Sequence, residues 1–558
     1  MIRNFQIACI VLIALFAGPA LAAGPGKSAI SSAHELATEA GFEVLAQGGN
    51  AFDAAVAVSA ALAVVEPASS GIGGGGFWLL HRESDGFSTM VDGREEAPGA
   101  ATRDMYLDEN GEVNRDLAVN GPLAAGIPGA AAAWVHISDT YGELEIADVL
   151  APAIRLAEKG FPVDVKYQQL LNWRAHIMLQ WPYTAEIFMP GDDLPEIGDI
   201  IVQKDLAATL KRLARGGHDG FYAGETAQLL VDGSREAGGI WTLEDFANYR
   251  AVERNPITIE HGDYTLLTAA PPSSGGIAIA QVLNLIEPFG WQEMGRVDRV
   301  HLLAEAMRRA YRDRALYLGD PDFVDIPTDM LLSDDYAAGL RTTLRMDRAL
   351  PSAYLAADPD RLRESNNTTH FSLIDADGNM VSATLTVNLP YGSAFAVPGT
   401  GILLNNEMDD FSAKPGAPNA FGLIGFQANS IEPGKRMLSS MSPTIITGPE
   451  RVAILGTPGG SRIITMVILG ILDFLEGNGP DSWVSLPRFH HQYLPDEISA
   501  ERDALTAEQI EALEARGHTV SVRDRPWGNM HAVLWDRLAN TLSAAHDPRL
   551  ESGGAEVR

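Results

Sequence analysis

Three short patterns in the 558-residue chain contain residue types that could do chemistry. The first, from Gly71 to Gly76, reads GIGGGG and formally contains the G-x-G-x-x-G pattern of dinucleotide-binding turns. Such a turn follows a strand and opens a helix. Here the Ala-rich stretch before the run favours a helix, and residues 77–80 (FWLL) after it favour a strand. The run therefore predicts a tight turn between closely approaching backbones, or a glycine turn that lines another kind of ligand pocket.

The two other patterns give weaker signals. His490 and His491 are adjacent, so a regular backbone does not aim both at one ion, and no carboxylate–histidine spacing supports a metal site. We expect core or surface histidines and no metal. Asn366 and Asn367 each open an Asn-x-Thr glycosylation sequon, which is a weak pattern. The chain has no Gly-x-Ser-x-Gly, which disfavours the triad of α/β-hydrolases.

Thiol chemistry is excluded by the position of the single cysteine, Cys9. Residues 1–22 have a positive start at Arg3, an apolar run and an Ala-Leu-Ala end, which together indicate a secretory signal peptide. The alternative, a membrane anchor, is disfavoured because the apolar run is shorter than the ~20 residues that a spanning helix needs. We therefore expect a periplasmic or secreted protein without a stable membrane anchor, whose mature chain lacks cysteine.

The composition is that of a globular protein with an acidic surface. Hydrophobic residues make up 46% and charged residues 20%, which excludes wholesale disorder. Asp and Glu outnumber Lys and Arg by 73 to 41, giving a formal charge of −32. Such a surface repels phosphate backbones, so we expect no nucleic-acid partner.

The apolar spacing predicts mixed α and β structure in the first two thirds of the chain. Residues 29–66 have helical spacing with a break at Gly48-Gly49-Asn50. Residues 77–80 and 90–98 are typical of strands, and amphipathic helices alternate with loops from Pro128 onward. The clearest helix covers residues 301–318, with apolar residues on one face and basic residues on the other.

The last third has a different pattern. Residues 350–367 have little periodicity and read as a loop or tail. Period-2 alternation from Thr369, split by Asp377-Gly378-Asn379, predicts a β-hairpin. PTIITG and RVAILGTPG predict two further strands, and RIITMVILGILDFLEGN predicts a buried helix.

Ordered motifs over nearly the whole chain resemble those of the γ-glutamyltranspeptidases, also called glutathione hydrolases. The most specific segment runs from Asn366 to Ser412 and includes TTHFSLIDADGN and ILLNNEMDDFS. The other matching motifs are GGNAFDAAVA (48–57), PASSGIGGGGFWLL (67–80), GREEAP (93–98), PPSSGGIAIAQVLN (271–284), LGDPDF (318–323), MLSSMSPT (437–444), GTPGGSRIIT (456–465) and SAAHDPR (543–549).

The resemblance implies an α/β fold, the four-layer αββα sandwich of N-terminal-nucleophile hydrolases, made as one inactive precursor. The precursor would cut itself between Asn367 and Thr368, giving a large subunit of residues 23–367 and a small subunit of residues 368–558. Thr368 would be both the processing residue and the nucleophile, with Thr369 as the neighbouring candidate. Its freed α-amine, with a pKa near ~8, could serve as the base that the hydroxyl needs.

The resemblance also implies a pocket for a γ-glutamyl group. Its carboxylate would pair with a guanidinium, whose planar donors suit that geometry, and its ammonium would bind to carboxylates. Two glycine N–H groups would bind the oxyanion, and one such donor is worth about 3–4 kcal/mol in other enzymes. The residues implied are Arg94, Ser439 and Ser440 for the carboxylate, Glu407, Asp410 and Asn388 for the ammonium, Gly459 and Gly460 for the oxyanion, and Thr386 near the nucleophile.

Such an enzyme would take the γ-glutamyl group of glutathione, its conjugates or other γ-glutamyl compounds onto Thr368 as an ester. Water, an amino acid or a peptide would then accept the group, with ping-pong kinetics and no cofactor. Residues 412–436 match the lid loop of bacterial members, but Phe421 stands where many carry a gating tyrosine. Met437 before LSS and Pro390 after VNL also depart from the common pattern.

Two other functions are compatible with parts of the sequence. A related acylase, cutting glutaryl or similar side chains from cephalosporins, would need no ammonium site and tends to lack the lid. For the EMDD sequence at Glu407 to Asp410, the alternative to binding the substrate ammonium is a solvated acidic loop. A non-enzymatic periplasmic binding protein would have no reason to keep Thr368, Thr386 and the glycine pair together.

Overall fold

The computed structural model describes residues 24–191, 193–355 and 368–558. The expected signal peptide with Cys9, and Asn367 of the expected cleavage site, lie outside these ranges. Within them, no helix is both long enough and apolar enough to cross a bilayer.

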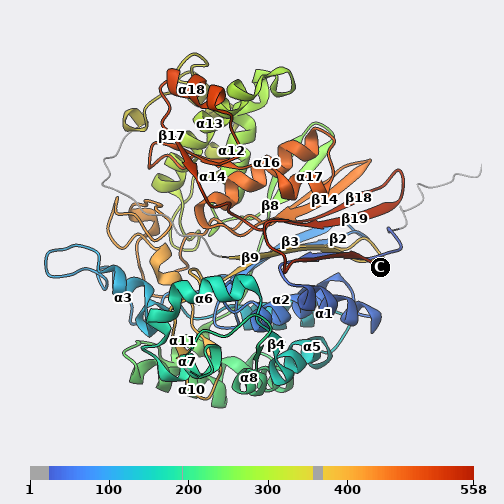
Figure 1. Ribbon diagram of the computed structural model, residues 1–558, viewed down its shortest axis with the longest axis vertical. Coiled ribbons are helices and arrows are strands. Elements are labelled where there is room, and N and C mark those ends of the chain that lie inside the picture. The colour runs from blue at the N-terminus through green and yellow to red at the C-terminus, as the bar shows by residue number, and fades with distance from the viewer. Residues whose placement is uncertain (1–23, 192, 356–367) are drawn as a thin grey trace, which may run out of the picture.

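Two antiparallel sheets lie at the centre of the molecule (Figure 1). The strands of the first, in spatial order, are β20 (Gly554–Val557), β1 (Ala29–Ser32), β9 (Thr369–Ile374), β10 (Met380–Thr386), β2 (Gly75–Arg82), β3 (Phe87–Gly93) and β6 (Val252–Arg254). Those of the second are β19 (Thr541–His546), β18 (His531–Asp536), β14 (Arg451–Gly456), β13 (Thr444–Thr447), β8 (Tyr264–Thr268) and β7 (Ile257–His261).

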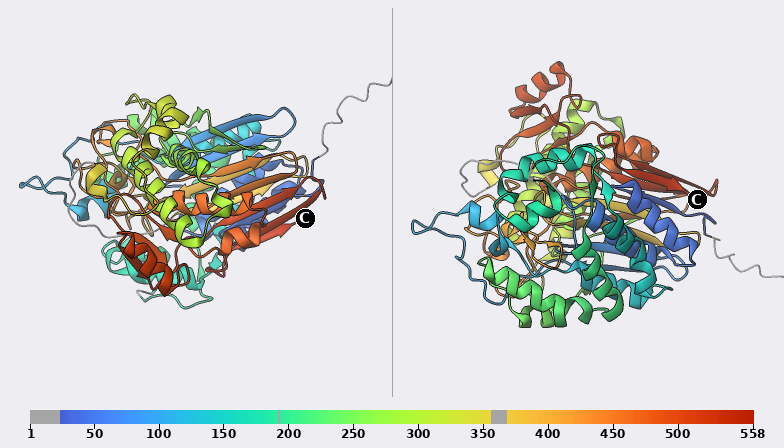
Figure 2. Two further views of the ribbon diagram at one scale, coloured as in Figure 1. Left: turned by 90° about the horizontal axis from the view of Figure 1, so that it is seen from above. Right: turned by 60° about the horizontal axis from the view of Figure 1, so that its bottom comes forward.

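Helices cover the outer face of each sheet, which completes four layers (Figures 1 and 2). On the first sheet lies α2 (Ala51–Val65), with α1 (Glu35–Ala46) beside it and α5 (Ile146–Lys159) and α8 (Lys204–Gly216) packed farther out. On the second lie α12 (Gly275–Ile286) and α16 (Ile463–Leu475), with α13 (Arg296–Tyr317) packed against α12. The αββα sandwich implied by the resemblance is therefore confirmed.

Smaller elements surround these layers. The helices are α3 (Arg115–Val119), α4 (Ala130–Tyr141), α6 (Val165–Met178), α7 (Pro182–Phe188), α9 (Asp219–Tyr222), α10 (Gly224–Glu236), α11 (Leu243–Asn248), α14 (Thr328–Leu332), α15 (Asp334–Arg341), α17 (Pro480–Ser485) and α18 (Ala507–Ala515). The strands are β4 (Phe161–Pro162), β5 (Ile200–Ile201), β11 (Ala396–Val397), β12 (Ile402–Leu403), β15 (Phe489–His490), β16 (Ile498–Glu501) and β17 (Val520–Arg523).

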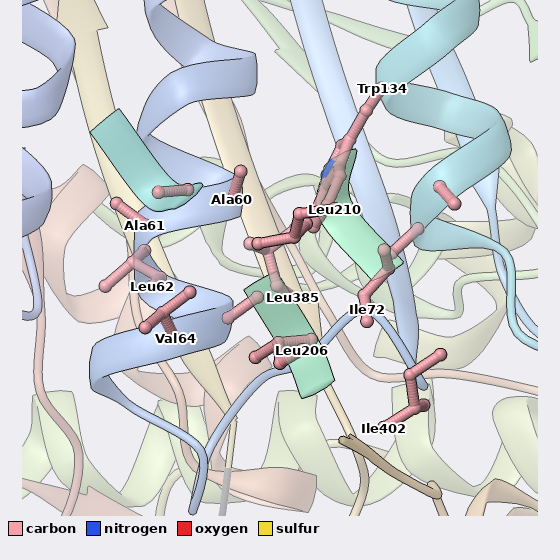
Figure 3. Packing of buried hydrophobic residues seen from close by; sticks show 14 of the residues in the cluster. Ala60, Ala61, Leu62, Val64, Ile72, Trp134, Leu206, Leu210, Leu385 and Ile402 are labelled. Carbon is pink, nitrogen blue, oxygen red and sulfur yellow. The ribbon is translucent and has the colours of Figure 1, made fainter. Parts of the chain in front are cut away.

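Helix α2 illustrates how local sequence and packing agree. Its first turn is closed by a capping box, in which Asn50 Oδ1 accepts from the N–H groups of Phe52 and Asp53 while the Asp53 carboxylate accepts from the Asn50 N–H. Every residue of the helix is buried. Its small alanines allow a close approach to the first sheet, and Figure 3 shows this helix beside Leu385 of β10.

Residues 29–32, expected as helix, form strand β1 instead. All four are buried, and they pair with β20 on one side and β9 on the other. The two rows of interstrand hydrogen bonds outweigh the helix preference of Ala29, a preference that is weak over so short a segment. The break at Gly48 to Asn50 is confirmed, because it separates α1 from α2.

The predicted hairpin is confirmed as β9 and β10, joined by a turn in which the Asp375 carboxylate accepts from the N–H groups of Asp377 and Asn379. Both strands are buried on both faces, because α2 covers one face and the second sheet covers the other. Successive side chains of these strands therefore point alternately to α2 and to the second sheet, and neither face meets solvent.

The basic face of α13 is also buried, which corrects the amphipathic interpretation. Arg308, Arg309 and Arg314 are at most 5% exposed. Arg308 and Arg309 both bind the Glu305 carboxylate. Glu305 lies one turn earlier on the same helix, but Ser352 and Ser440, which accept from Arg308 and Arg314, belong to distant segments that helical spacing does not reveal.

The glycine run after α2 is a tight turn between closely approaching backbones, as expected. A Cβ on Gly73 would lie 2.1 Å from the Leu403 carbonyl oxygen, and one on Gly74 would lie 2.1 Å from that of Thr386. The turn thereby brings the start of β2 against the end of β10.

Substituting Gly74→Ala is expected to destabilise the protein by roughly 1–3 kcal/mol, because the new methyl group overlaps backbone that cannot move independently. Thermal unfolding measures the effect. Gly295→Ala is the matched control, since no atom lies within 4 Å of a Cβ placed there. Equal melting temperatures for the two variants would contradict the steric argument.

Candidate active site

Thr368 lies immediately before β9, at one end of the central hairpin. It is 4% exposed. The register pairs Thr369 with Leu385 and Thr386 with Gly75. Thr368, the end of β10 and the glycine turn before β2 therefore lie together at one end of the central strands of the first sheet. A nucleophile placed there is held by two strands in which every residue is buried.

A small pocket beside Thr368 brings together nine of the ten site residues expected from the sequence. They are Arg94, Thr368, Thr386, Asn388, Glu407, Asp410, Ser439, Ser440 and Gly460. The tenth, Gly459, lines a larger cleft that also borders Thr368. The pocket has about 20 Å³ open to water, enough for a single molecule. Its own side chains therefore fill most of the space that a ligand would occupy.

Arg94 is the centre of this pocket. It is 1% exposed and follows β3, and its Nη1 lies 2.6 Å from Glu407 Oε2 while its Nη2 donates to Asp410 Oδ2 at 2.6 Å. Its Nε donates to the Met437 carbonyl at 3.2 Å. Burial alone would lower the pKa of Arg94, but the charges of Glu407, Asp410 and Glu95 outweigh burial and raise it. Arg94 therefore stays a cation.

The carboxylates around Arg94 form a buried acidic cluster rather than a solvated loop. Glu407 and Asp410 belong to one 3₁₀ turn, η5 (Glu407–Asp410), and Glu407 is 1% exposed. Burial raises the pKa of Glu407 to about 7 although Arg94 lowers it, and burial likewise raises the pKa of Asp410. Glu407 is thus close to a change of charge near neutral pH.

Asn388 and the two serines line the pocket and keep unused hydrogen-bonding capacity. Asn388 donates from Nδ2 to the Asn406 carbonyl, and its buried Oδ1 has no hydrogen-bond partner in the described structure. The Ser439 hydroxyl accepts from the Met441 N–H, and that of Ser440 accepts from Arg314. Since a hydroxyl both donates and accepts, each serine can still donate its proton to an anion.

The glycine pair is required by backbone geometry and by a neighbouring ring. Gly459 and Gly460 have φ of 145° and 56°, values that residues with a side chain rarely adopt. A Cβ on Gly460 would lie 2.4 Å from the ring of Phe421. The pair leads through a 3₁₀ turn into α16, so the positive end of a helix lies at the site. Phe421, in the lid-like segment, therefore packs directly on the expected oxyanion site.

The sequence did not single out two residues of this cluster. Glu95 is fully buried next to Arg94, and burial and the charge of Glu407 raise its pKa. Arg314 of α13 is 5% exposed and donates to the hydroxyls of Ser274 and Ser440. Glu95 lies within the GREEAP motif, which was a usable signal, whereas Arg314 gave none because it falls on an apparently solvated helix face.

His490 and His491 are core histidines. Both are at most 2% exposed, and they contact the Thr465 hydroxyl and the Asp496 carboxylate respectively. In the part of the chain that the structure describes, no three or more His, Cys, Asp or Glu side chains gather as metal ligands.

Two face-to-face sheets between helical layers, with a threonine opening a central strand, define the class of N-terminal-nucleophile hydrolases. Comparisons with known proteins agree. The family model described as gamma-glutamyltranspeptidase matches residues 37–557. A glutathione hydrolase proenzyme of Escherichia coli (strain K12) is 41% identical over 525 residues, covering 93% of this chain and 90% of the relative.

Acylases are also similar to this chain. An acylase ACY 1 proenzyme of Pseudomonas sp. (strain SE83) is 36% identical, covering 94% of this chain and 92% of its own. The crystal structure of a cephalosporin acylase from Bacillus halodurans superposes with a TM-score of 0.84 at 27% identity, covering 98% of this chain and 99% of that one. The chain belongs to the γ-glutamyltranspeptidase family, and it is an enzyme.

Replacing Arg94→Gln is expected to destabilise the fold by about 3–5 kcal/mol, because it leaves buried carboxylates without their cation. The loss should be greater at about pH 8 than at about pH 5.5. The folded pKa of Glu407 is already raised from 4.5 to about 7, so over that range the folded state holds a proton that the unfolded state has lost, and stability falls as pH rises. In the Arg94→Gln variant the pKa of Glu407 rises further, so stability falls with pH over a wider range.

Thermal unfolding at the two pH values measures this prediction. The control is Arg155→Gln, since Arg155 is 44% exposed and pairs with Glu43 at the surface, where a pair is worth at most about 1 kcal/mol. A loss for Arg94→Gln that does not depend on pH would show that the carboxylates are not charged against Arg94.

Proposed function

We propose that this enzyme cleaves the γ-glutamyl amide bond of glutathione and its conjugates and passes the group to water, amino acids or peptides. The observation that carries the proposal is the gathering of one arginine, two carboxylates, two serines and an orphan amide oxygen beside Thr368. These groups complement an α-carboxylate and an α-ammonium at one end of a ligand whose other end lies at a nucleophile.

We further propose that the chain is a precursor that cuts itself between Asn367 and Thr368 into residues 23–367 and 368–558, after a signal peptide (1–22) has directed it out of the cytoplasm. The name proenzyme, carried by the similar hydrolase and acylase, supports processing. The Thr368 hydroxyl would attack the Asn367 carbonyl and take the acyl group from nitrogen to oxygen. That shift breaks the C–N bond and frees the α-amine of Thr368, and water would then hydrolyse the ester, which leaves a carboxylate on Asn367 and restores the Thr368 hydroxyl.

In the mature enzyme that amine would take the hydroxyl proton of Thr368 as its oxygen attacks the γ-carbonyl of the substrate. The N–H groups of Gly459 and Gly460 would donate to the oxyanion, and the proton would pass to the departing amine. A water molecule or an acceptor amine would then reverse these steps on the threonyl ester. Thr386, whose hydroxyl accepts from the Asn388 N–H, would hold the end of β10 against the nucleophile.

Recognition would proceed by exchange of ion pairs. Arg94 is already bound to Glu407 and Asp410, and little free space remains around it. The substrate carboxylate would replace these two acids on Arg94, with Ser439 and Ser440 donating to it, and the released acids would bind the substrate ammonium with Asn388. Both ends of the zwitterion are needed to keep every buried charge paired.

A cephalosporin or glutaryl acylase is the second candidate, and it is supported by the acylase relatives. A glutaryl group has a carboxylate but no ammonium. It would therefore displace Glu407 and Asp410 from Arg94 and give them no cation in return. The buried acids favour the γ-glutamyl substrate for that reason.

The Thr368→Ala variant is expected to remain a single chain of about 60 kDa, because it lacks the hydroxyl that attacks the Asn367 carbonyl. Denaturing gel electrophoresis of the purified protein measures the cut. Thr369→Ser is the matched control and should be processed, since it keeps the hydroxyl that donates to Glu66. A cleaved Thr368→Ala chain would place the nucleophile elsewhere.

The wild-type enzyme is expected to hydrolyse γ-glutamyl-p-nitroanilide with a higher kcat/KM than glutaryl-p-nitroanilide, because only the former replaces the cation that Glu407 and Asp410 lose. Asp410→Asn should narrow the difference, since it removes one of the acids that the ammonium neutralises. Release of nitroaniline measures both rates. Preference for the glutaryl compound would overturn the ammonium assignment and favour the acylase.

A further inference from the structure

A second cavity, which Arg94 does not line, also borders Thr368. This cleft has about 880 Å³ open to water, and of the residues around the small pocket only Thr368 also lines it. Gly459, which precedes Gly460 of the small pocket, lies on its wall. Under the proposed function the γ-glutamyl part would occupy the small pocket with its γ-carbonyl at Thr368, so the atoms beyond the scissile amide would enter the cleft.

The cleft contains three cations, and two of them are already neutralised. Lys166 is buried against the Glu66 carboxylate. Arg549 lies 2.8 Å from Glu501 and 3.1 Å from Asp547. Arg525 is exposed, and in the described structure it has neither a hydrogen bond nor an ion pair. It is thus the cation of the cleft that can pair with an incoming anion.

The same wall carries buried polar atoms that lack a partner. Asn529 is 1% exposed, and neither Oδ1 nor Nδ2 of its side chain is hydrogen-bonded within the described structure. The Nε1 of Trp527, a residue 5% exposed, is likewise unpaired there. Buried polar groups are nearly always hydrogen-bonded. One acceptor and two donors beside the nucleophile match the N–H and C=O groups of a peptide bond.

We propose that Arg525 is a specificity-determining residue of this cleft, where it favours leaving groups and acceptors that have a free carboxylate. The inference rests on the proposed function, because it concerns what lies beyond the γ-glutamyl amide. The need for a local cation follows from the formal charge of −32 on the chain, which repels anions at long range.

The test compares two chromogenic donors that differ by one carboxylate, γ-glutamyl-4-nitroanilide and γ-glutamyl-3-carboxy-4-nitroanilide. The measured quantity is kcat/KM for the carboxylated donor divided by that for the uncharged donor. Arg525→Gln should lower this ratio roughly three- to fivefold, the effect of losing a partly exposed ion pair. Arg525→Lys should restore most of it, and Arg155→Gln, a change on the distant helix α5, should leave the wild-type ratio.

A transfer assay supplies a second readout, with glycylglycine and glycylglycine amide as acceptors. Arg525→Gln should weaken the preference for glycylglycine over its amide by a similar factor. It should raise the KM for glycylglycine more than it lowers kcat. An unchanged ratio in both assays, or an equal effect of Arg155→Gln, would overturn the inference while leaving the proposed function intact. A wild-type enzyme that cleaves neither donor would overturn both.

Discussion

A guanidinium buried among carboxylates is the interaction on which this site depends. Arg94 at the end of β3 is bound to Glu407 and Asp410, more than 300 residues later in the chain. An unpaired charge at that depth would cost several kcal/mol, so the three side chains hold each other, and the segments that carry them, in place before any ligand arrives. The lid-like segment follows these acids directly, and its Phe421 rests on Gly460.

Most of the layout was predictable where local signals are strong. The helix break at Gly48 to Asn50, the hairpin from Thr369 and the apolar α16 all formed as expected. The pocket residues were identified from motif resemblance, since an isolated threonine or an EMDD segment has no distinctive chemistry by itself. The structure adds that these motifs, scattered from residue 94 to residue 463, surround a single cavity.

What the sequence could not predict depends on partners that are distant along the chain. Strand β1 lies between β9 and β20, and nothing within the few residues around Ala29 indicates either neighbour. Arg314 lies on a helix face whose spacing is the same whether water or protein covers it. The neutralisation of Arg94 could not be foreseen either, because the resemblance assigns Glu407 and Asp410 to a ligand and does not say what they contact without one.

The strand order of the first sheet bears on how the processed enzyme would come apart. If the chain is cut before Thr368, β1 belongs to one fragment while both of its neighbours, β9 and β20, belong to the other. The fragments are then interleaved within one sheet, so dilution alone cannot separate them. Reassembly would have to be bimolecular and to rethread a central strand, whereas the uncut chain folds in a single molecule. The mature enzyme would therefore owe its persistence to slow unfolding rather than to an equilibrium that it could re-establish.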